Sequence, residues 1–201
     1  MRKKSDTEKL HDLIRDSVRD LNRQISEKIG NGIGIDLNSI SVMPVGKITK
    51  KLGDLDVPTV GIYTRILGNI EGICLLLIPV RSSLFVANMV SGRNTSHVEM
   101  LTTEDLVTLE ELGESIVKSI LHTLSTYLGV NAYVSKPATV FDLKRNILNF
   151  ILIGLGNYKN LRMVIDIVLK GKNKEIIGHS MIILDSLSVC KMVDIISRQD
   201  N

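Results

Sequence analysis

Several polar side chains with distinct chemistry share one face of a predicted helix in the middle of the chain. Glu111, Ser115, Lys118 and His122 follow each other at three or four positions, and Glu114 lies beside them, opposite an apolar stripe. A carboxylate on this face can accept a hydrogen bond from water or pair with a cation. A solvated helix surface has the same composition. Two interpretations therefore stay open, a surface that contacts a partner and a surface that contacts only water.

The sequence offers no pattern for a metal or cofactor site. Its four histidines are scattered without metal-ligand spacing, and no Ser-His-Asp or Cys-His arrangement can be argued. Residues 30–34 are rich in glycine but follow a predicted helix, which favours a turn over a phosphate cradle. Cys74 and Cys190 each lie in an apolar run, which predicts buried, reduced thiols. We expect no metal and no cofactor of the protein's own.

The elements that must position the polar face begin with an amphipathic helix. Apolar residues recur at helical spacing from Leu10 to Ile29, with charged residues between them. Three extended runs follow, over residues 39–45, 57–64 and 71–80. Turns rich in Gly, Asp and Asn separate these runs and favour an antiparallel meander. A short helix is predicted over residues 82–90, before a polar break at residues 92–96.

The same order of elements then restarts. A helix start at Thr103 opens a second long apolar stripe, which ends at Gly129. Further apolar or extended runs and a closing helix follow, over residues 130–136, 147–155, 161–169, 176–184 and 186–197. Residues 72–79 and 178–185 match, because each has a glycine, a strand and a polar turn before an amphipathic helix.

This repeat predicts an α+β fold with two pseudo-symmetric copies of helix, three strands and short helix. We expect an antiparallel sheet packed by two long helices. Each copy should cover the apolar face of the other, which predicts a single domain over residues 1–201. Copy one spans about residues 8–95, and copy two spans about residues 103–199.

The chain resembles the CheC, CheX and FliY family of chemotaxis phosphatases in residues 67–79, residues 109–114 and Pro137. The family signature is an acidic residue or Ser, three residues, Glu, two residues, Asn, and 22 residues before Pro. Glu111 stands at the Glu position, and 22 residues (115–136) separate Glu114 from Pro137. Two positions depart from the signature. Glu114 replaces the Asn, and Val107 stands where the family has Ser or Asp.

The resemblance implies docking to the phosphorylated receiver domain of CheY. In the family, the Glu pairs with a lysine of the receiver, and the Asn amide positions a water for attack on the aspartyl phosphate. This is catalysis by positioning, since the receiver supplies the Mg²⁺. By the resemblance, the catalytic residues are Glu111 and Glu114. The residues implied to dock the regulator are Glu111, Ser115, Lys118 and Pro137.

Glu114 changes the chemistry that the resemblance implies. A carboxylate lacks the NH₂ donor of an amide and lies near phosphoryl oxygens, where like charges about 4 Å apart repel by roughly 4 kcal/mol at an effective dielectric of 20. A hydrogen bond to water contributes only about 0.5–1.5 kcal/mol. Unless Mg²⁺ or a neighbouring Lys offsets the repulsion, we expect weakened or lost phosphatase activity. The alternative is an inactive CheC-like module that binds CheY phosphate or the receptor deamidase CheD, a family partner of CheC.

The first long helix contains neither Glu-x-x-Asn nor Asp-x-x-Asn. Aligning the glycines that end the two long helices places Asp12 and Arg15 in the signature positions. Aligning the prolines that follow the helices instead places Val18 and Leu21 there. The sequence leaves both alignments open.

Composition excludes two other classes of function. The net charge of +3 and an aromatic content of 3% do not suit a nucleic-acid binder, which needs a basic stripe with stacking aromatics. The apolar runs fall far short of the roughly 20 residues that span a bilayer. We therefore expect a cytoplasmic protein with no nucleic acid and no membrane among its partners.

Overall fold

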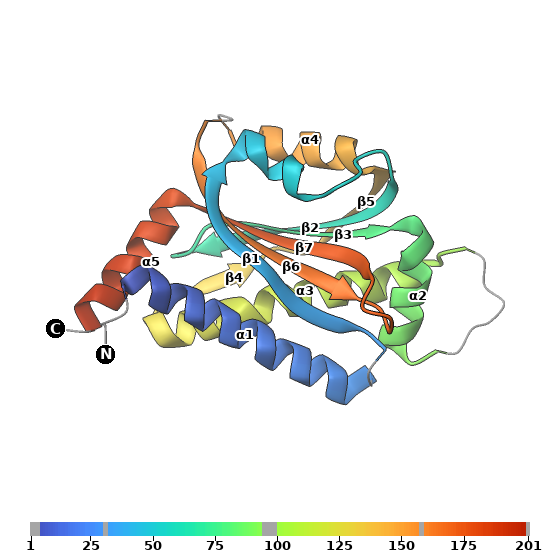
Figure 1. Cartoon of the computed structure of the whole chain (residues 1–201), viewed down its shortest axis with the longest axis horizontal. Helices are drawn as coiled ribbons and strands as arrows, with labels where there is room; N and C mark the ends of the chain where they lie inside the picture. Colours follow the sequence, from blue (N-terminus) through green and yellow to red (C-terminus); the bar gives the residue numbers. More distant parts are fainter. Residues whose placement is uncertain (1–4, 30–31, 94–99, 157–158, 200–201) are drawn as a thin grey trace.

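A seven-stranded sheet forms the middle layer of the fold (Figure 1). The computed structural model of the chain describes residues 5–29, 32–93, 100–156 and 159–199. The strands are β1 (Gly34–Pro44), β2 (Pro58–Gly68), β3 (Gly72–Pro79), β4 (Ala132–Val134), β5 (Ala138–Leu143), β6 (Leu161–Lys170) and β7 (Ile176–Asp185). They follow the order β1-β6-β7-β3-β2, and both β4 and β5 pair with β2. All the pairings are antiparallel.

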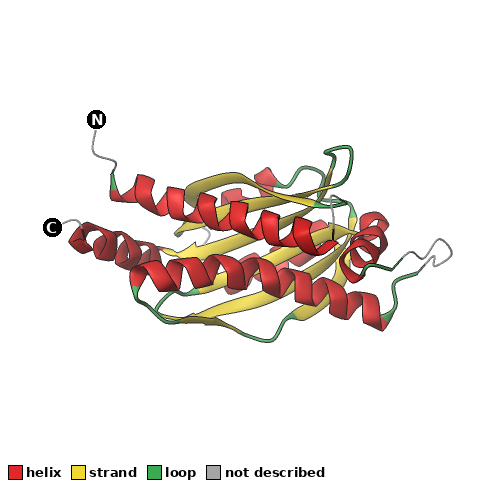
Figure 2. Ribbon diagram, turned by 90° about the horizontal axis from the view of Figure 1, so that it is seen from below, coloured by secondary structure: helices red, strands yellow, loops and turns green. Residues whose placement is uncertain are grey.

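Helices cover both faces of this sheet. They are α1 (Asp6–Ile29), η1 (Val45–Lys51), α2 (Val80–Ser91), α3 (Thr103–Leu128), α4 (Lys144–Gly154) and α5 (Ser186–Gln199). Figure 1 shows α1, α3 and α5 below the sheet and η1 with α4 above it. Figure 2 shows the two long helices side by side across the lower face. The predicted α+β fold, with an antiparallel sheet packed by two long helices, is confirmed.

The two copies exchange the strands that follow their long helices. β1 of the first copy pairs with β6 of the second, and β5 of the second copy pairs with β2 of the first. The predicted meander is therefore wrong for its first strand, because β1 does not pair with β2. Turn signals in a sequence show where strands end, whereas pairing partners depend on contacts between distant segments. Each copy completes the sheet of the other, and the single domain over residues 1–201 stays a prediction.

The central pair, β3 and β7, shows the predicted pseudo-symmetry directly. Ile73 pairs with Ile183, and its aligned counterpart His179 pairs with Leu77, the counterpart of Ile183. The aligned residues Cys74 and Ser180 meet across the axis, with Sγ and Oγ 3.6 Å apart. The alignment of residues 72–79 with residues 178–185 is thus reproduced by the strand register.

Two apolar cores hold the layers together. The first lies between the sheet and α1, α2, α3 and α5, and the second lies between the other face and η1 with α4. The apolar stretch at residues 147–155 belongs largely to α4, whose buried residues Ile147, Leu148, Ile151 and Leu152 recur at helical spacing. This helix and η1 occupy equivalent places, because η1 lies between β1 and β2 along the chain and α4 lies between β5 and β6.

One cysteine departs from expectation. Cys74 is buried, and burial raises the pKa of its thiol to about 12 although a hydrogen bond with Ser180 opposes the shift. Cys190 is exposed on α5, so the prediction of a buried thiol is wrong there. Its apolar neighbours in sequence lie on the other side of the helix, where Met192 and Ile196 are buried.

Candidate functional site

The helix that carries the candidate site, α3, is anchored at its start by a capping box. The Oγ1 of Thr102 accepts a hydrogen bond from the N–H of Asp105, and the Asp105 carboxylate accepts one from the N–H of Thr102. Arg93, which follows α2, donates to the same carboxylate at 2.5 Å. Burial raises the pKa of Asp105, but the Thr102 hydrogen bonds and the Arg93 charge outweigh it and hold the pKa below its usual range.

A glycine lets α3 lie close to the sheet. A Cβ at Gly113 would be 3.4 Å from side-chain atoms of both Ile62 and Leu76, on β2 and β3. The residues around it on this face of α3 are also buried: Leu109, Leu112, Ile116, Val117 and Ile120. The opposite face of α3 is thereby turned away from the sheet.

The predicted docking residues of α3 lie on this outward face. Glu111, Ser115 and Lys118 are exposed, and so is His122. Among the described residues, the Glu111 side chain makes no hydrogen bond or ion pair. Its carboxylate is therefore available to a cation on another molecule.

Glu114 is held differently from Glu111. Its side chain is 31% exposed, and its carboxylate lies 2.8 Å from the Nζ of Lys118, one helical turn further on. Lys118 itself is 59% exposed. A pair at i, i+4 with Glu before Lys is a favourable helical geometry. Lys118 is thus the neighbouring cation that could offset the Glu114 charge, and the four-residue spacing in the sequence was the signal for it.

Pro137 lies half-buried in the link between β4 and β5. Two residues further on, the Oγ1 of Thr139 donates a hydrogen bond to the Oε1 of Glu110. This bond ties the start of β5 to α3 one residue before Glu111. Sequence reasoning missed Glu110, because a carboxylate between two signature residues has no motif of its own.

The structure decides between the two alignments of the first helix. Ser41 of β1 pairs with Val164, and the equivalent pair in the other half is Val140 with Gly61. The offset between Ser41 and Val140 is the same as that between the glycines at positions 30 and 129. Position 30 itself lies outside the described residues.

Burial in the helices agrees with this offset. It matches Leu10 with Leu109 and Val18 with Val117, and all four residues are buried. Val18 and Leu21 therefore cannot present a docking surface. Asp12 and Arg15 take the places of Glu111 and Glu114, and the two form an ion pair with each other. The α1 face carries an arginine where the signature needs an amide.

Nothing in the described part of the chain gathers three His, Cys, Asp or Glu side chains for a metal ion. None of the helices, in the residues described, is long and apolar enough to cross a membrane. The polar face of α3 offers carboxylate acceptors and an ammonium donor. It can orient water or bind a charged partner.

Comparisons with known proteins identify the fold. No family model matches the sequence, and no curated protein matches it. Solved structures do match. FliY from Thermotoga maritima superimposes with a TM-score of 0.69 at 13% sequence identity, covering 96% of each chain. FliM in the FliM–SpeE complex from H. pylori gives a TM-score of 0.67 at 12% identity, covering 100% of this chain and 98% of that one.

A third structure contains a response regulator. CheX in the CheX–CheY complex with BeF₃ and Mg²⁺ from Borrelia burgdorferi gives a TM-score of 0.52 at 15% identity, covering 86% of this chain and 96% of the other. The chain therefore has the CheC-like fold of CheX, FliY and the FliM middle domain. This is the fold that the resemblance in the sequence implied.

Proposed function

We propose that the protein docks a phosphorylated CheY-type receiver domain on the outward face of α3 and promotes hydrolysis of its aspartyl phosphate at a reduced rate. The fold is shared with a CheX whose complex with CheY has been solved. The observation that carries the proposal is the Glu114–Lys118 pair, 2.8 Å apart on that face. The receiver brings the Mg²⁺, and both proteins act in the cytoplasm.

Glu114 and Lys118 together supply the hydrogen-bond acceptor and the donor that a single amide side chain would supply. A Glu114 oxygen accepts a hydrogen bond from the attacking water, and the Lys118 ammonium is the donor that a carboxylate lacks. Water attacks phosphorus, the bond from phosphorus to the aspartate oxygen breaks, and the aspartate leaves as a carboxylate with free phosphate. Lys118 also weakens the repulsion between Glu114 and the phosphoryl oxygens. Because the Lys118 side chain is 59% exposed and held, among the described residues, only by its pair with Glu114, the water is positioned less well than by an amide.

Docking rests on Glu111. Its carboxylate is exposed and has no partner in the described part of the chain, so it can pair with a lysine of the receiver without breaking an existing interaction. Ser115 and Lys118 extend the surface along the helix, and Pro137 flanks it. The Thr139–Glu110 hydrogen bond holds the Pro137 segment beside this surface.

A second candidate is a module that binds the receiver, or CheD, without hydrolysis. Glu114 in place of the amide favours it, since the residue that positions water is the one that differs. The fold is also that of FliM in its FliG and SpeE complexes from H. pylori. Both candidates use Glu111, and only the first needs Glu114.

Phosphate release separates the two candidates. CheY-type regulators of the same organism are phosphorylated and mixed with the wild type, Glu111→Lys or Glu114→Asn, and binding is measured in parallel. We expect the wild type to accelerate hydrolysis severalfold, Glu114→Asn to accelerate it about tenfold more, and Glu111→Lys to abolish docking. The matched control is Asp16→Lys, at the α1 position equivalent to Ser115, which should change neither readout.

The outcomes are distinct. Binding without acceleration by the wild type supports the second candidate. Failure of every regulator to bind, or equal losses in Glu111→Lys and Asp16→Lys, would show that the α3 face docks no receiver.

A further inference from the structure

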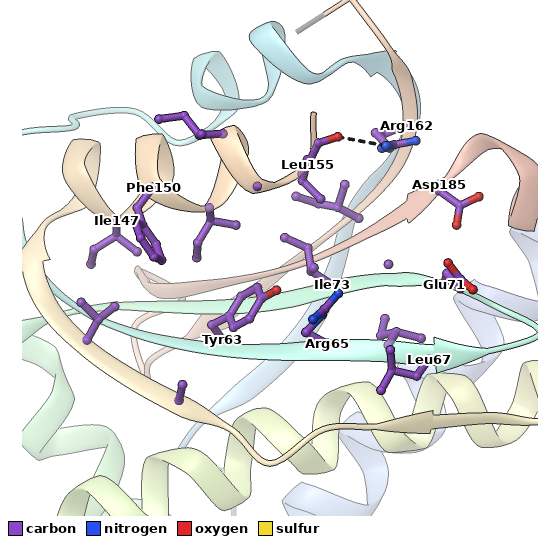
Figure 3. Close-up of a pocket in the computed structure, with 18 of the residues that line it drawn as sticks. Tyr63, Arg65, Leu67, Glu71, Ile73, Ile147, Phe150, Leu155, Arg162 and Asp185 are labelled. Carbon is purple, nitrogen blue, oxygen red and sulfur yellow. Dashed lines mark hydrogen bonds between the residues drawn. The ribbon is translucent and has the colours of Figure 1, made fainter. Parts of the chain in front are cut away.

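A cavity of about 740 Å³ lies on the sheet face opposite α3, beneath α4 (Figure 3). Its floor is formed by β2, β3 and β7, its wall by β5 and its roof by α4. Neither Glu111 nor Glu114 lines it. Small-ligand sites in proteins usually measure about 300–1,000 Å³, so the volume suits a small molecule.

In the other half of the molecule, polar side chains occupy the place that is equivalent to this cavity. The position equivalent to Tyr63 in the cavity floor is Asp166, which accepts a hydrogen bond from Asn38 at 2.6 Å and lies 3.3 Å from the Nδ1 of His179. On neighbouring β1, the Oγ atoms of Ser39 and Ser41 accept hydrogen bonds from Lys51 at 2.7 and 2.9 Å. Polar side chains thus occupy the equivalent place, so the fold itself does not create the cavity.

One end of the cavity is an apolar chamber. Ile73 of β3 and Ile147 and Ile151 of α4 are buried around it. The Phe150 side chain of α4 points toward Tyr63 of β2 on the opposite side of the cavity (Figure 3). Phe150 is 82% exposed, so this aromatic ring has gained little burial from folding. An apolar ligand between the two rings would bury it.

The other end is lined by charged side chains whose charges cancel. Figure 3 shows Arg65, Arg162, Glu71 and Asp185 together at this end. Asp185 already accepts hydrogen bonds from the N–H and Oγ of Ser188, at 2.7 and 2.9 Å. At this end two cations balance two anions, so an ionic ligand head would gain little there and lose its hydration. The remaining charged lining residue, Asp142 of β5, accepts a hydrogen bond from Asn146.

Arg162 carries a hydrogen-bond donor without an acceptor. Its Nη2 donates to the carbonyl oxygen of Leu155 at 3.1 Å, which holds the end of α4 to β6. Its Nε is buried and has no partner in the described structure. Leaving a buried donor unpaired is costly, and a turn of the Arg162 guanidinium toward a ligand acceptor at this end would remove that cost.

We propose that this cavity binds an uncharged amphiphile, with its apolar chain in the chamber beneath Phe150 and a carbonyl oxygen accepting a hydrogen bond from Arg162. The volume sets the size of the ligand, the cancelled charges select a neutral head, and the unpaired donor selects an acceptor. This inference does not rest on the proposed function of α3.

Three probes with one tail test the class of ligand. Decanamide, decanoate and decylamine are titrated into the full chain below their micelle concentrations, and binding is followed by calorimetry and by amide chemical shifts. We expect decanamide to bind saturably at one site, about fivefold or more tighter than either charged probe. The shifted amides should lie in β2, β3 and α4.

Variants test the place of binding. Phe150→Ala should weaken decanamide at least about fivefold, while the matched control Phe141→Ala, an exposed aromatic of β5 outside the lining, should stay within about twofold. Arg162→Met should remove the preference for decanamide over decylamine. If Arg162→Met does not fold, the comparison of Phe150→Ala with Phe141→Ala still tests whether decanamide binds in this cavity. Absence of saturable binding, tighter binding of a charged probe, or equal losses in the two phenylalanine variants would overturn the proposal.

Discussion

The two halves of the sheet are built alike but are covered differently on their second face. In the half formed by β1 and β6, η1 packs down with Val45 and Ile48 buried, and a polar network surrounds Asp166. In the half formed by β2 and β5, the helix α4 spans a cavity. The long helices differ as well, since α1 carries an Asp12–Arg15 pair where α3 carries Glu111 and Glu114.

This difference separates structural requirements from functional ones. The strand exchange, the central β3–β7 pair and the buried stripes of α1 and α3 occur in both halves, so the fold needs them. The outward face of α3 and the cavity beneath α4 occur in one half only. We assign function to these two features, because they break the pseudo-symmetry and packing does not require them.

The largest expected effect on stability concerns the equivalent glycines of the central strands, β3 and β7. A Cβ at Gly72 would lie 2.3 Å from the Ile183 carbonyl oxygen, whereas at the equivalent Gly178 it would lie 3.2 Å from the Leu77 oxygen. Gly72→Ala should therefore lower the free energy of unfolding by about 3 kcal/mol and Gly178→Ala by about 1 kcal/mol, because only the first forces the backbone to move. Urea unfolding measures both. Equal losses of unfolding free energy in the two variants would mean that the backbone accommodates the added Cβ equally well at both glycines.

The next effect tests the polar network against the cavity floor. Asp166→Ala leaves the Asn38 amide and His179 without their buried acceptor and should cost about 2 kcal/mol. Tyr63→Phe, at the equivalent position, should cost under about 0.5 kcal/mol, because it removes a hydroxyl that makes no hydrogen bond to the described residues. Thermal unfolding of both variants checks the contrast. A small effect at Asp166 would show that water replaces the network.

A third test compares the starts of the two long helices. Ser5 and Glu8 form an exposed capping box on α1, with 2.7 Å between the Ser5 nitrogen and the Glu8 carboxylate. The corresponding carboxylate of α3, Asp105, is buried and also bonds Arg93. We expect Asp105→Ala to cost about 1–2 kcal/mol and Glu8→Ala about 0.5 kcal/mol.

The Asp105 contribution should depend on pH. Because its pKa is lowered in the folded protein, its stabilising effect is complete above the unfolded pKa of about 3.9 and is lost as pH falls through the folded value. The difference in unfolding free energy between wild type and Asp105→Ala should hold at pH 7 and shrink below about pH 4. A difference that persists at pH 2 would assign the effect to packing instead of charge.

The smallest effect on stability concerns the ion pairs of the two outward faces. Lys118→Ala and Arg15→Ala should each change the unfolding free energy by less than about 0.5 kcal/mol, because exposed pairs contribute little. Activity should separate them. Lys118→Ala should lower acceleration of phosphate release about threefold by restoring the repulsion at Glu114, and Arg15→Ala should not. A faster Lys118→Ala variant would mean that the lysine blocks Glu114.

Much of the site could be predicted from local spacing. The capping residues and the apolar stripe of α3 define its outward face, so Glu111, Ser115 and Lys118 were placed correctly as exposed. The Glu114–Lys118 pair follows from four-residue helical spacing. Their role in docking a regulator stays a prediction, because exposure on a helix does not identify what the helix contacts.

What the sequence by itself determined is the set of elements and their repetition: two long amphipathic helices, the strands between glycine-rich turns, and the match of residues 72–79 with residues 178–185. Periodicity and turn chemistry are local, so they can be read along the chain. Only the tertiary structure decided that β1 joins β6, that Asp12 and not Val18 is the counterpart of Glu111, and that α4 spans a cavity. Strand pairing and the filling of space depend on contacts between residues far apart in sequence, and no local pattern encodes them.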